Sequence, residues 1–260
     1  MLPALRIFGL SLQSYSFFAA LAGLTGFVLS ALTLRRLGLG ARSLLLPLLC
    51  LILAPAGARL LNYLTNPEPY LEGFSPWSLR YTKLSLMGGL GAGLLGILLG
   101  CALLRRAPGP ILDAFVLPAA LGILLLKLGC FCNGCCFGKP TEGILGMVFP
   151  ANTLRYRFLD SLPLLRASSP RVHPTQLYEM AGALLALGLA LGFGRRFGPG
   201  GRCAIFAGVF ALARWAVLPL RALPYSESVL QVGYPLLYGL TAALAAAWLA
   251  LLWRKKRHVP

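Results

Sequence analysis

The residues best suited to chemistry lie in two short stretches of the sequence. Residues 127–141 read KLGCFCNGCCFGKPT and carry four of the seven cysteines, an asparagine and two lysines. Residues 173–179 read HPTQLYE and place imidazole, hydroxyl, amide, phenol and carboxylate groups within seven positions. Thiols, a histidine that titrates near neutral pH and a carboxylate suit proton transfer and nucleophilic chemistry. These two stretches therefore define the candidate site.

His173 and Glu179 are the candidate proton acceptors. His173 is one of two histidines, and the other, His258, lies in a basic tail. Glu179 falls about one turn inside an apolar segment, where a carboxylate must pair with a cation or line a cavity. Arg214 and Arg59 are the possible partners. Two alternatives stay open: a catalytic pair, or a structural ion pair with His173 bonded at the start of a helix.

Arg214 is the clearest buried charge in the sequence. It lies inside an apolar segment that contains no acidic residue. An arginine at that depth must pair with a carboxylate, backbone carbonyls or a phosphate. Arg221 follows seven residues later, about two helical turns on and on the same face. Two such arginines predict a clamp for a phosphodiester, although Arg221 could also extend to the membrane interface.

The cysteines give weaker signals. Their spacing, C-x-C-x2-C-C, is not one of the patterns that indicate a metal site, so we predict no bound metal. Disulfides or a purely structural role are the favoured interpretations for cysteines facing an oxidising compartment. A thiol-redox function of Cys135 and Cys136 is a lesser alternative, because adjacent cysteines pair only with strain. The four cysteines in this stretch are Cys130, Cys132, Cys135 and Cys136.

The composition predicts an all-α integral membrane protein. Of 260 residues, 58% are hydrophobic and only 12% are charged, which is too apolar for a soluble domain of this size. The net charge of +17 does not indicate nucleic-acid binding, because the basic residues stand at the ends of apolar runs. Residues 1–260 are expected to form a single transmembrane domain.

Seven apolar runs are long enough to span a membrane. The first contains Ala20-Leu21-Ala22, which resembles a signal-peptide cleavage site, but polar residues around Gln13 interrupt the run and favour a retained span. Outside the spans, two longer loops are expected at about 65–83 and 127–172. The spans are one ending near residue 34, then 43–63, 84–104, 110–126, 174–194, 203–220 and 232–253.

The basic clusters predict the orientation. They follow the first, third, fifth and seventh spans. Because short cytoplasmic loops are enriched in lysine and arginine, the N-terminus is expected outside and the C-terminus inside. The loops 65–83 and 127–172 then both face outward.

Glycines mark two further features. In the third span, Gly89 and Gly93 are four residues apart, as are Gly96 and Gly100, which predicts close helix packing or a backbone approach to a lipid head group. In the cysteine-rich stretch, glycines let the backbone approach a ligand closely or adopt positive φ, and the preceding helix is expected to end near Leu126. These glycines are Gly129, Gly134 and Gly138.

HPTQLYE and LGxFxNGxxxGK, set in seven spans, resemble the prolipoprotein diacylglyceryl transferase family. The resemblance covers nearly the whole chain. Further pieces that match are ALRIFGL at 4–10, Gly57, Arg59 and Tyr63 as G-x-R-x-x-x-Y, SLMGGLGAGLLG at 85–96, GMVFP at 146–150, and Arg214 with Arg221.

The resemblance implies an enzyme of the bacterial inner membrane. Such an enzyme moves a diacylglyceryl group from phosphatidylglycerol to a lipobox cysteine thiol in the signal peptide of a prolipoprotein, releases glycerol phosphate and uses no cofactor. It needs a proton acceptor and positive charge on the departing phosphate. The implied catalytic residues are His173, Glu179 and Tyr178. The implied head-group residues are Lys127, Asn133, Gly134, Arg214, Arg221 and Arg59.

The sequence also departs from the family's pattern. Met87 replaces a histidine, Phe8 a tyrosine and Leu218 a glutamate, while Lys127, Cys130 and Cys135 stand where the family has arginine, asparagine and glutamate. The retained HPTQLYE, Asn133 and Arg214 favour a transferase. The replaced histidine favours the alternative, a homologue without activity that serves as a structural subunit of a membrane complex.

Overall fold

The computed structural model describes residues 4–7, 10–75, 83–149, 171–223 and 225–257. Within them, seven helices are long and apolar enough to cross a membrane, which confirms the predicted fold class. The strands are β1 (Ala4–Ile7) and β2 (Leu10–Gln13). The α-helices are α1 (Ser14–Arg36), α2 (Leu45–Thr65), α3 (Glu68–Leu71), α4 (Leu86–Leu103), α5 (Pro108–Asn133), α7 (Thr175–Phe193), α8 (Gly201–Val217) and α9 (Tyr234–Arg257). Short 3-10 turns are Ala41–Leu44, Gly194–Phe197 and Leu218–Leu220, and Val229–Gly233 is a π-turn before α9.

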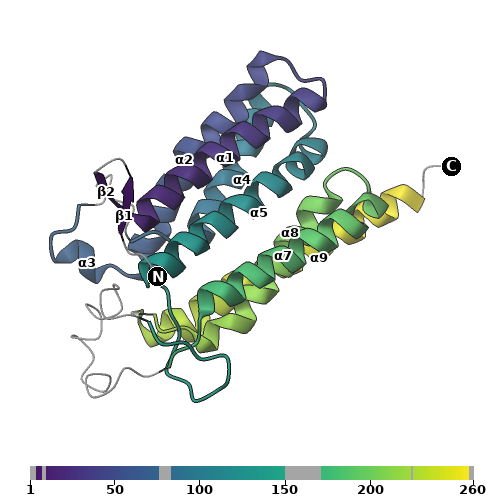
Figure 1. Ribbon diagram of the computed structural model, residues 1–260. Helices are drawn as coiled ribbons and strands as arrows, with labels where there is room; N and C mark the ends of the chain where they lie inside the picture. The colour runs from purple at the N-terminus through teal and green to yellow at the C-terminus, as the bar shows by residue number, and fades with distance from the viewer. Residues whose placement is uncertain (1–3, 8–9, 76–82, 150–170, 224, 258–260) are drawn as a thin grey trace.

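The long helices form two groups that lie side by side (Figure 1). Helices α1, α2, α4 and α5 make one group, and α7, α8 and α9 make the other. One apolar core joins them, because α5 packs against both α7 and α8. Its buried residues are Val116, Ala120 and Ile123 of α5, Ala183, Ala186 and Ala190 of α7, and Phe206 and Phe210 of α8.

Asp113 fixes one end of this junction. Its carboxylate accepts hydrogen bonds from the backbone N–H groups of Gly200 and Cys203, each at 2.9 Å. These N–H groups lie at the start of α8, where an acidic group also complements the helix dipole. The contact ties α5 to α8 at the opposite end of α8 from Arg214.

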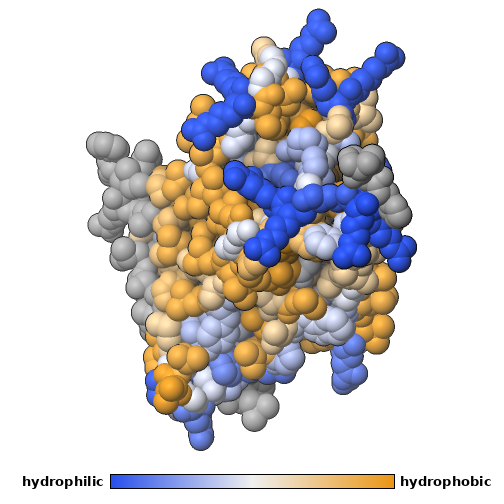
Figure 2. All heavy atoms as spheres, turned by 90° about the vertical axis from the view of Figure 1, so that its right-hand side faces the viewer, coloured by the Kyte–Doolittle hydropathy of each residue, from blue (hydrophilic) through white to orange (hydrophobic). Residues whose placement is uncertain are grey.

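The outer surface of the bundle suits lipid. The spans expose many large apolar side chains, among them Leu24 at 62%, Leu95 at 55% and Leu244 at 70%. Figure 2 shows apolar side chains over most of one face, with hydrophilic ones gathered mainly in its upper half. Basic residues occupy the last turns of α1 and α9 and the 3-10 turn after α7. This is the surface of a multi-pass membrane protein.

The glycines of α4 make a close contact with α2. A Cβ added at Gly88 would lie 2.6 Å from the Cβ of Leu61, and one added at Gly57 would lie 2.7 Å from the carbonyl oxygen of Gly88. Gly89, Gly96 and Gly100 also face α2. The packing interpretation of this glycine-rich span is thus confirmed.

One element was not foreseen and one prediction was wrong. Before the first span, where no element was assigned, β1 and β2 pair antiparallel. The helix expected to end near Leu126 continues to Asn133, because Gly129 packs against α1, where an added Cβ would lie 2.8 Å from the Cβ of Phe18. The break comes at Gly134, which ends α5 in the left-handed conformation with φ of 69°.

Gly88→Ala is expected to lower the free energy of unfolding by about 1–3 kcal/mol, because the added methyl must push α2 and α4 apart. Gly91→Ala, in the same helix, is the matched control. Nothing lies within 4 Å of its added Cβ, so it should be neutral or stabilising. Unfolding of both variants in detergent micelles measures the difference, and equal effects would contradict a close α2–α4 contact.

Candidate active site

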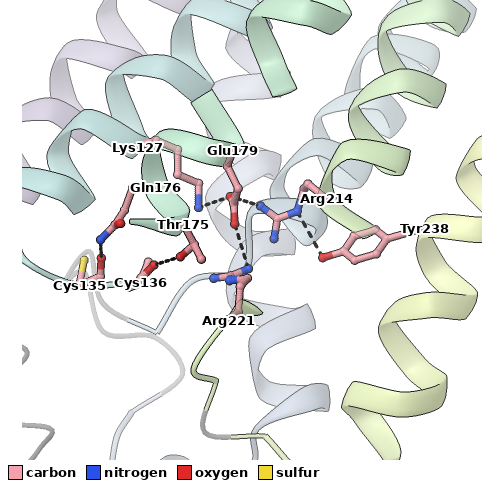
Figure 3. A network of polar contacts seen from close by, with 9 residues as sticks. All are labelled: Lys127, Cys135, Cys136, Thr175, Gln176, Glu179, Arg214, Arg221 and Tyr238. Carbon is pink, nitrogen blue, oxygen red and sulfur yellow. Dashed lines mark hydrogen bonds and ion pairs between the residues drawn. The ribbon is translucent and has the colours of Figure 1, made fainter. Parts of the chain in front are cut away.

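Glu179 is the centre of a buried ion-pair cluster (Figure 3). Its Oε2 lies 2.5 Å from Nζ of Lys127 and also accepts a hydrogen bond from Nη1 of Arg214. Its Oε1 lies 3.3 Å from Nη1 of Arg221. The side chains of all four residues are 10% exposed or less. The expected pairing of Glu179 with Arg214 is therefore present, and Lys127 and Arg221 join it.

Tyr238 of α9 holds Arg214 in place. Its hydroxyl accepts a hydrogen bond of 3.3 Å from Nε of Arg214, and its ring centroid lies 5.7 Å from the guanidinium carbon. Tyr238 is only 1% exposed, so both contacts are shielded from solvent. Sequence reasoning missed this residue, and the only signal for it is the pairing of Tyr234 and Tyr238 one turn apart at the start of the last span.

Four separate segments bring these charges together. Lys127 comes from the last two turns of α5, Glu179 from the second turn of α7, and Arg214 from the last turn of α8. Arg221 lies beyond α8, in extended backbone after the 3-10 turn. The two arginines were expected on one face of a continuous helix; that geometry was wrong, because α8 ends at Val217, but both do reach the same carboxylate.

Gly138 lets its own segment approach those of His173 and Arg221 closely. Its N–H donates to the carbonyl of His173 at 2.8 Å, and its backbone bridges that of Arg221. A Cβ at Gly138 would lie 2.5 Å from the carbonyl oxygen of Leu220 and 2.8 Å from Cγ2 of Thr175. Gly138 is thus required for close approach and not, as predicted, for positive φ. Among the expected glycines only Gly134 has positive φ.

Two side chains at the start of α7 donate hydrogen bonds to the cysteine-rich turn. Oγ1 of Thr175 donates to the carbonyl of Cys136, and Nε2 of Gln176 donates to the carbonyl of Cys135, each at 2.6 Å. Both donors are fully buried. The turn is therefore buried in protein, as irregular backbone near a membrane must be unless it lines a wet cavity. Gln176 belongs to the HPTQLYE motif, but the sequence alone indicates no role for it.

All seven cysteines are free thiols, so of the two favoured interpretations, disulfides or a purely structural role, the structure does not show the disulfides. Cys136 has a positive φ of 60°, and its Sγ lies within 4.8 Å of those of Cys130 and Cys135. Hydrogen bonds from those two thiols, together with the positive charges of Lys127 and Arg221, hold the pKa of the Cys136 thiol well below its usual range.

His173 and Tyr178 form a pair beside the cluster. Nδ1 of His173 lies 3.3 Å from the hydroxyl of Tyr178, and both side chains are half-buried. The backbone of His173 is also fixed, because its N–H donates to the carbonyl of Lys139 and its carbonyl accepts from Thr175. The imidazole is therefore oriented by a phenol and not by Glu179.

The other predicted head-group residues lie around the centre. Asn133 is buried, and its Nδ2 donates to Sγ of Cys135 at 3.8 Å. Gly134 follows it and turns the chain. The guanidinium carbon of Arg59, in α2, lies over the ring of Phe74, 5.1 Å from its centroid.

Two departures from the family's pattern occupy one apolar cluster. Leu218 is buried with Tyr234 and Tyr238, and Met87 of α4 packs against this cluster. Where the resemblance implies a histidine and a glutamate, this chain has two apolar residues around the tyrosine that holds Arg214. The third departure, Phe8, lies outside the described residues.

The fold and the site define a multi-pass membrane protein with a buried, cation-rich cluster near one end of its helices. The model of the family described as prolipoprotein diacylglyceryl transferase matches residues 3–254. The chain therefore belongs to this family.

Its relatives are similar over part of their length. All three of the following are named phosphatidylglycerol–prolipoprotein diacylglyceryl transferase. The protein of Nitratidesulfovibrio vulgaris is 32% identical over 197 residues, which cover 73% of this chain and 59% of that protein. That of Treponema denticola is 29% identical over 47% of this chain and 45% of its own length. That of Wolbachia pipientis is 36% identical over 47% of this chain and 40% of its own length. The chain thus spans about half the length of the curated relatives it matches.

Glu179→Gln is expected to lower the free energy of unfolding by about 3–5 kcal/mol, because three buried cations lose their counter-charge. Glu142→Gln is the control, since Glu142 is exposed and its change should cost less than about 0.5 kcal/mol. Denaturation in mixed micelles gives both values. The double variant Glu179→Gln/Arg214→Gln should lose less than the sum of the single variants, and strict additivity would contradict a direct ion pair.

Proposed function

We propose that this chain is a phosphatidylglycerol–prolipoprotein diacylglyceryl transferase. The observation that carries the proposal is the charge of the buried cluster. Lys127, Arg214 and Arg221 face a single carboxylate, Glu179, which leaves two positive charges in a region closed to water. An anionic ligand would stabilise this arrangement, and the names of the relatives identify phosphatidylglycerol as a lipid of the right charge.

Arg221 is the residue best placed to receive the lipid phosphate. Its Nε is buried and has no hydrogen-bond partner among the described residues. A buried, unused donor on a charged group is costly, so it is expected to meet a ligand. The guanidinium can keep Nη1 on Glu179 and present Nε to a phosphate oxygen. Arg214 and Lys127 supply further positive charge, and Asn133 and Gly134 line the adjoining turn.

The proposed reaction replaces a carbon–oxygen bond with a carbon–sulfur bond. The lipobox thiolate attacks the diacylglyceryl CH2 carbon that bears the phosphate, and the electron pair of the breaking C–O bond leaves with glycerol phosphate. Negative charge therefore grows on the leaving phosphate. Fixed cations pointed at that charge lower the barrier, and one such donor contributes about 10²–10³-fold in rate.

The incoming thiol needs a proton acceptor, and we assign this role to His173. Glu179 is unsuited to it, because three cations engage its two oxygens. His173 is half-buried, and its Nδ1 lies 3.3 Å from the hydroxyl of Tyr178, which orients the imidazole. Tyr178 is then a positioning residue, and Glu179 holds the cations at fixed positions.

The same reasoning supports a topology and a location. Basic residues end α1 and α9 and follow α7, which favours the cytoplasm for those ends, with the N-terminus outside. The segments that follow α2 and α5 then face outward, where a prolipoprotein signal peptide would present its cysteine. The implied setting is the inner membrane of a bacterium.

The purified chain should transfer label from diacyl-labelled phosphatidylglycerol to a lipobox peptide and release glycerol phosphate. A peptide with serine in place of the lipobox cysteine is the control and should stay unlabelled. In sealed vesicles of known orientation, a peptide that cannot cross the membrane should be modified only on one side. This is the side that the segment after α5, which contains residue 142, faces. Reaction from the cytoplasmic side alone would overturn the topology.

In the same assay, His173→Gln should lower the rate by about 10²–10⁴-fold, because the thiol loses its proton acceptor. Tyr178→Phe, which removes only the hydroxyl partner, should cost less. A variant His173→Gln at full rate would remove His173 from the mechanism. If the wild-type chain labels none of several lipobox peptides, the non-enzymatic subunit replaces the transferase as the better account.

A further inference from the structure

Three cysteine sulfurs meet beside the ion-pair cluster, and the proposed transfer reaction uses none of them. The Sγ atoms of Cys130, Cys135 and Cys136 all lie within 4.8 Å of one another. Cys130 is 5% exposed, and the other two are half-buried. Metal–sulfur bonds of about 2.3 Å place three ligating sulfurs roughly 4 Å apart. The cluster is thus within about 1 Å of the geometry that a bound metal ion requires.

Backbone geometry and hydrogen bonds around the cysteines hold the three sulfurs together. Cys130 projects from the last turn of α5, and the chain then reverses at Gly134, where the N–H of Cys135 donates to the carbonyl of Cys130 at 3.0 Å. Cys136 takes a positive φ, which costs free energy for a residue other than glycine. Thr175 and Gln176 lock the carbonyls of Cys136 and Cys135 from the opposite side.

The neighbours of the sulfurs resemble the outer shell of a metal site. Nδ2 of Asn133 donates a hydrogen bond to Sγ of Cys135. Residues that ligate a metal are commonly held by such a hydrogen bond from a neighbouring group. Lys127 stands one turn before Cys130 on the same helix, and the backbone of Arg221 bridges that of Gly138, two residues after Cys136. Positive charge of this kind stabilises thiolates, which are the ligating form of cysteine.

We propose that Cys130, Cys135 and Cys136 form a trigonal site for one soft monovalent cation of the Cu(I) class. Thiolates select soft metals, and Cu(I) accepts three of them. Structural zinc takes four protein ligands, whereas the described residues supply three in this group. The cysteine spacing predicts no metal site, because the ligands are brought together by the turn at Gly134 and not by a repeated C-x2-C unit.

The local charges favour a monovalent ion over a divalent one. Lys127, Arg214 and Arg221 against Glu179 leave two positive charges next to the sulfurs. Three thiolates with Cu(I) carry two negative charges and balance them, whereas three thiolates with Zn(II) carry only one. The same charges would hold a lipid phosphate, so the metal complex and an anionic lipid are expected to compete. Metal binding must therefore be measured without lipid.

The test is a Cu(I) titration of the full chain in non-ionic detergent, under anaerobic and reducing conditions, against a Cu(I)-specific chelator. The wild type should bind one Cu(I) per chain. Cys132→Ser is the matched control, because Cys132 lies in the same turn of α5 and outside the sulfur cluster. Its affinity should equal that of the wild type, whereas Cys130→Ser and Cys136→Ser should lose more than the roughly 100-fold seen for outer-shell changes.

Thermal unfolding without metal checks that each serine variant is folded. The titration contains neither peptide nor phosphatidylglycerol, so the measured Cu(I) affinity is independent of transferase activity. Equal Cu(I) affinity in the wild type and Cys130→Ser would overturn the proposal. So would a wild-type chain that binds no Cu(I) while a thiol count finds all seven cysteines reduced. A one-to-one Zn(II) complex that Cu(I) does not displace would overturn the choice of metal.

Discussion

The structure depends on one buried carboxylate. Glu179 contacts Lys127, Arg214 and Arg221, which come from three other segments of the chain. Each charge pays several kcal/mol on leaving water, and only close pairing offsets this. The ion pairs therefore fix where α5, α7, α8 and the extended segment after α8 meet. The surplus of positive charge at that point is the feature that we propose binds a phosphate.

The remaining contacts hold the residues of this cluster in place. Tyr238 holds Arg214 from α9, Gly138 lets the backbones around His173 and Arg221 approach, and the start of α7 grips the cysteine-rich turn. The replacement of a histidine and a glutamate by Met87 and Leu218 is compensated locally, because both residues belong to one apolar contact around Tyr238. The cluster is thus intact without those two polar groups. Under the proposed transferase function, another residue must accept the thiol proton, and we propose that it is His173.

Much of this could be predicted from the sequence, for identifiable physical reasons. Long apolar runs with basic ends predict the spans, and the cost of a charge in lipid predicts that Glu179 and Arg214 pair. The end of α5 was misplaced, because Gly129 reads as a helix breaker until its contact with Phe18 is known. The roles of Tyr238, Gln176 and the three clustered sulfurs depend on contacts between residues far apart in the chain, and no local pattern encodes them.

The most direct test is whether the detergent-solubilised chain retains phosphatidylglycerol, as measured by native mass spectrometry. Retention shows whether the excess positive charge around Glu179 binds a lipid phosphate. Arg221→Gln should weaken retention at least about tenfold, since a hydrogen bond to a charged group contributes about 1.5–3 kcal/mol. Arg171→Gln is the control; Arg171 is exposed and bonded to the carbonyls of Gly146 and Ile144, so its loss should leave the bound lipid unchanged. Equal retention by wild type and Arg221→Gln would contradict the account.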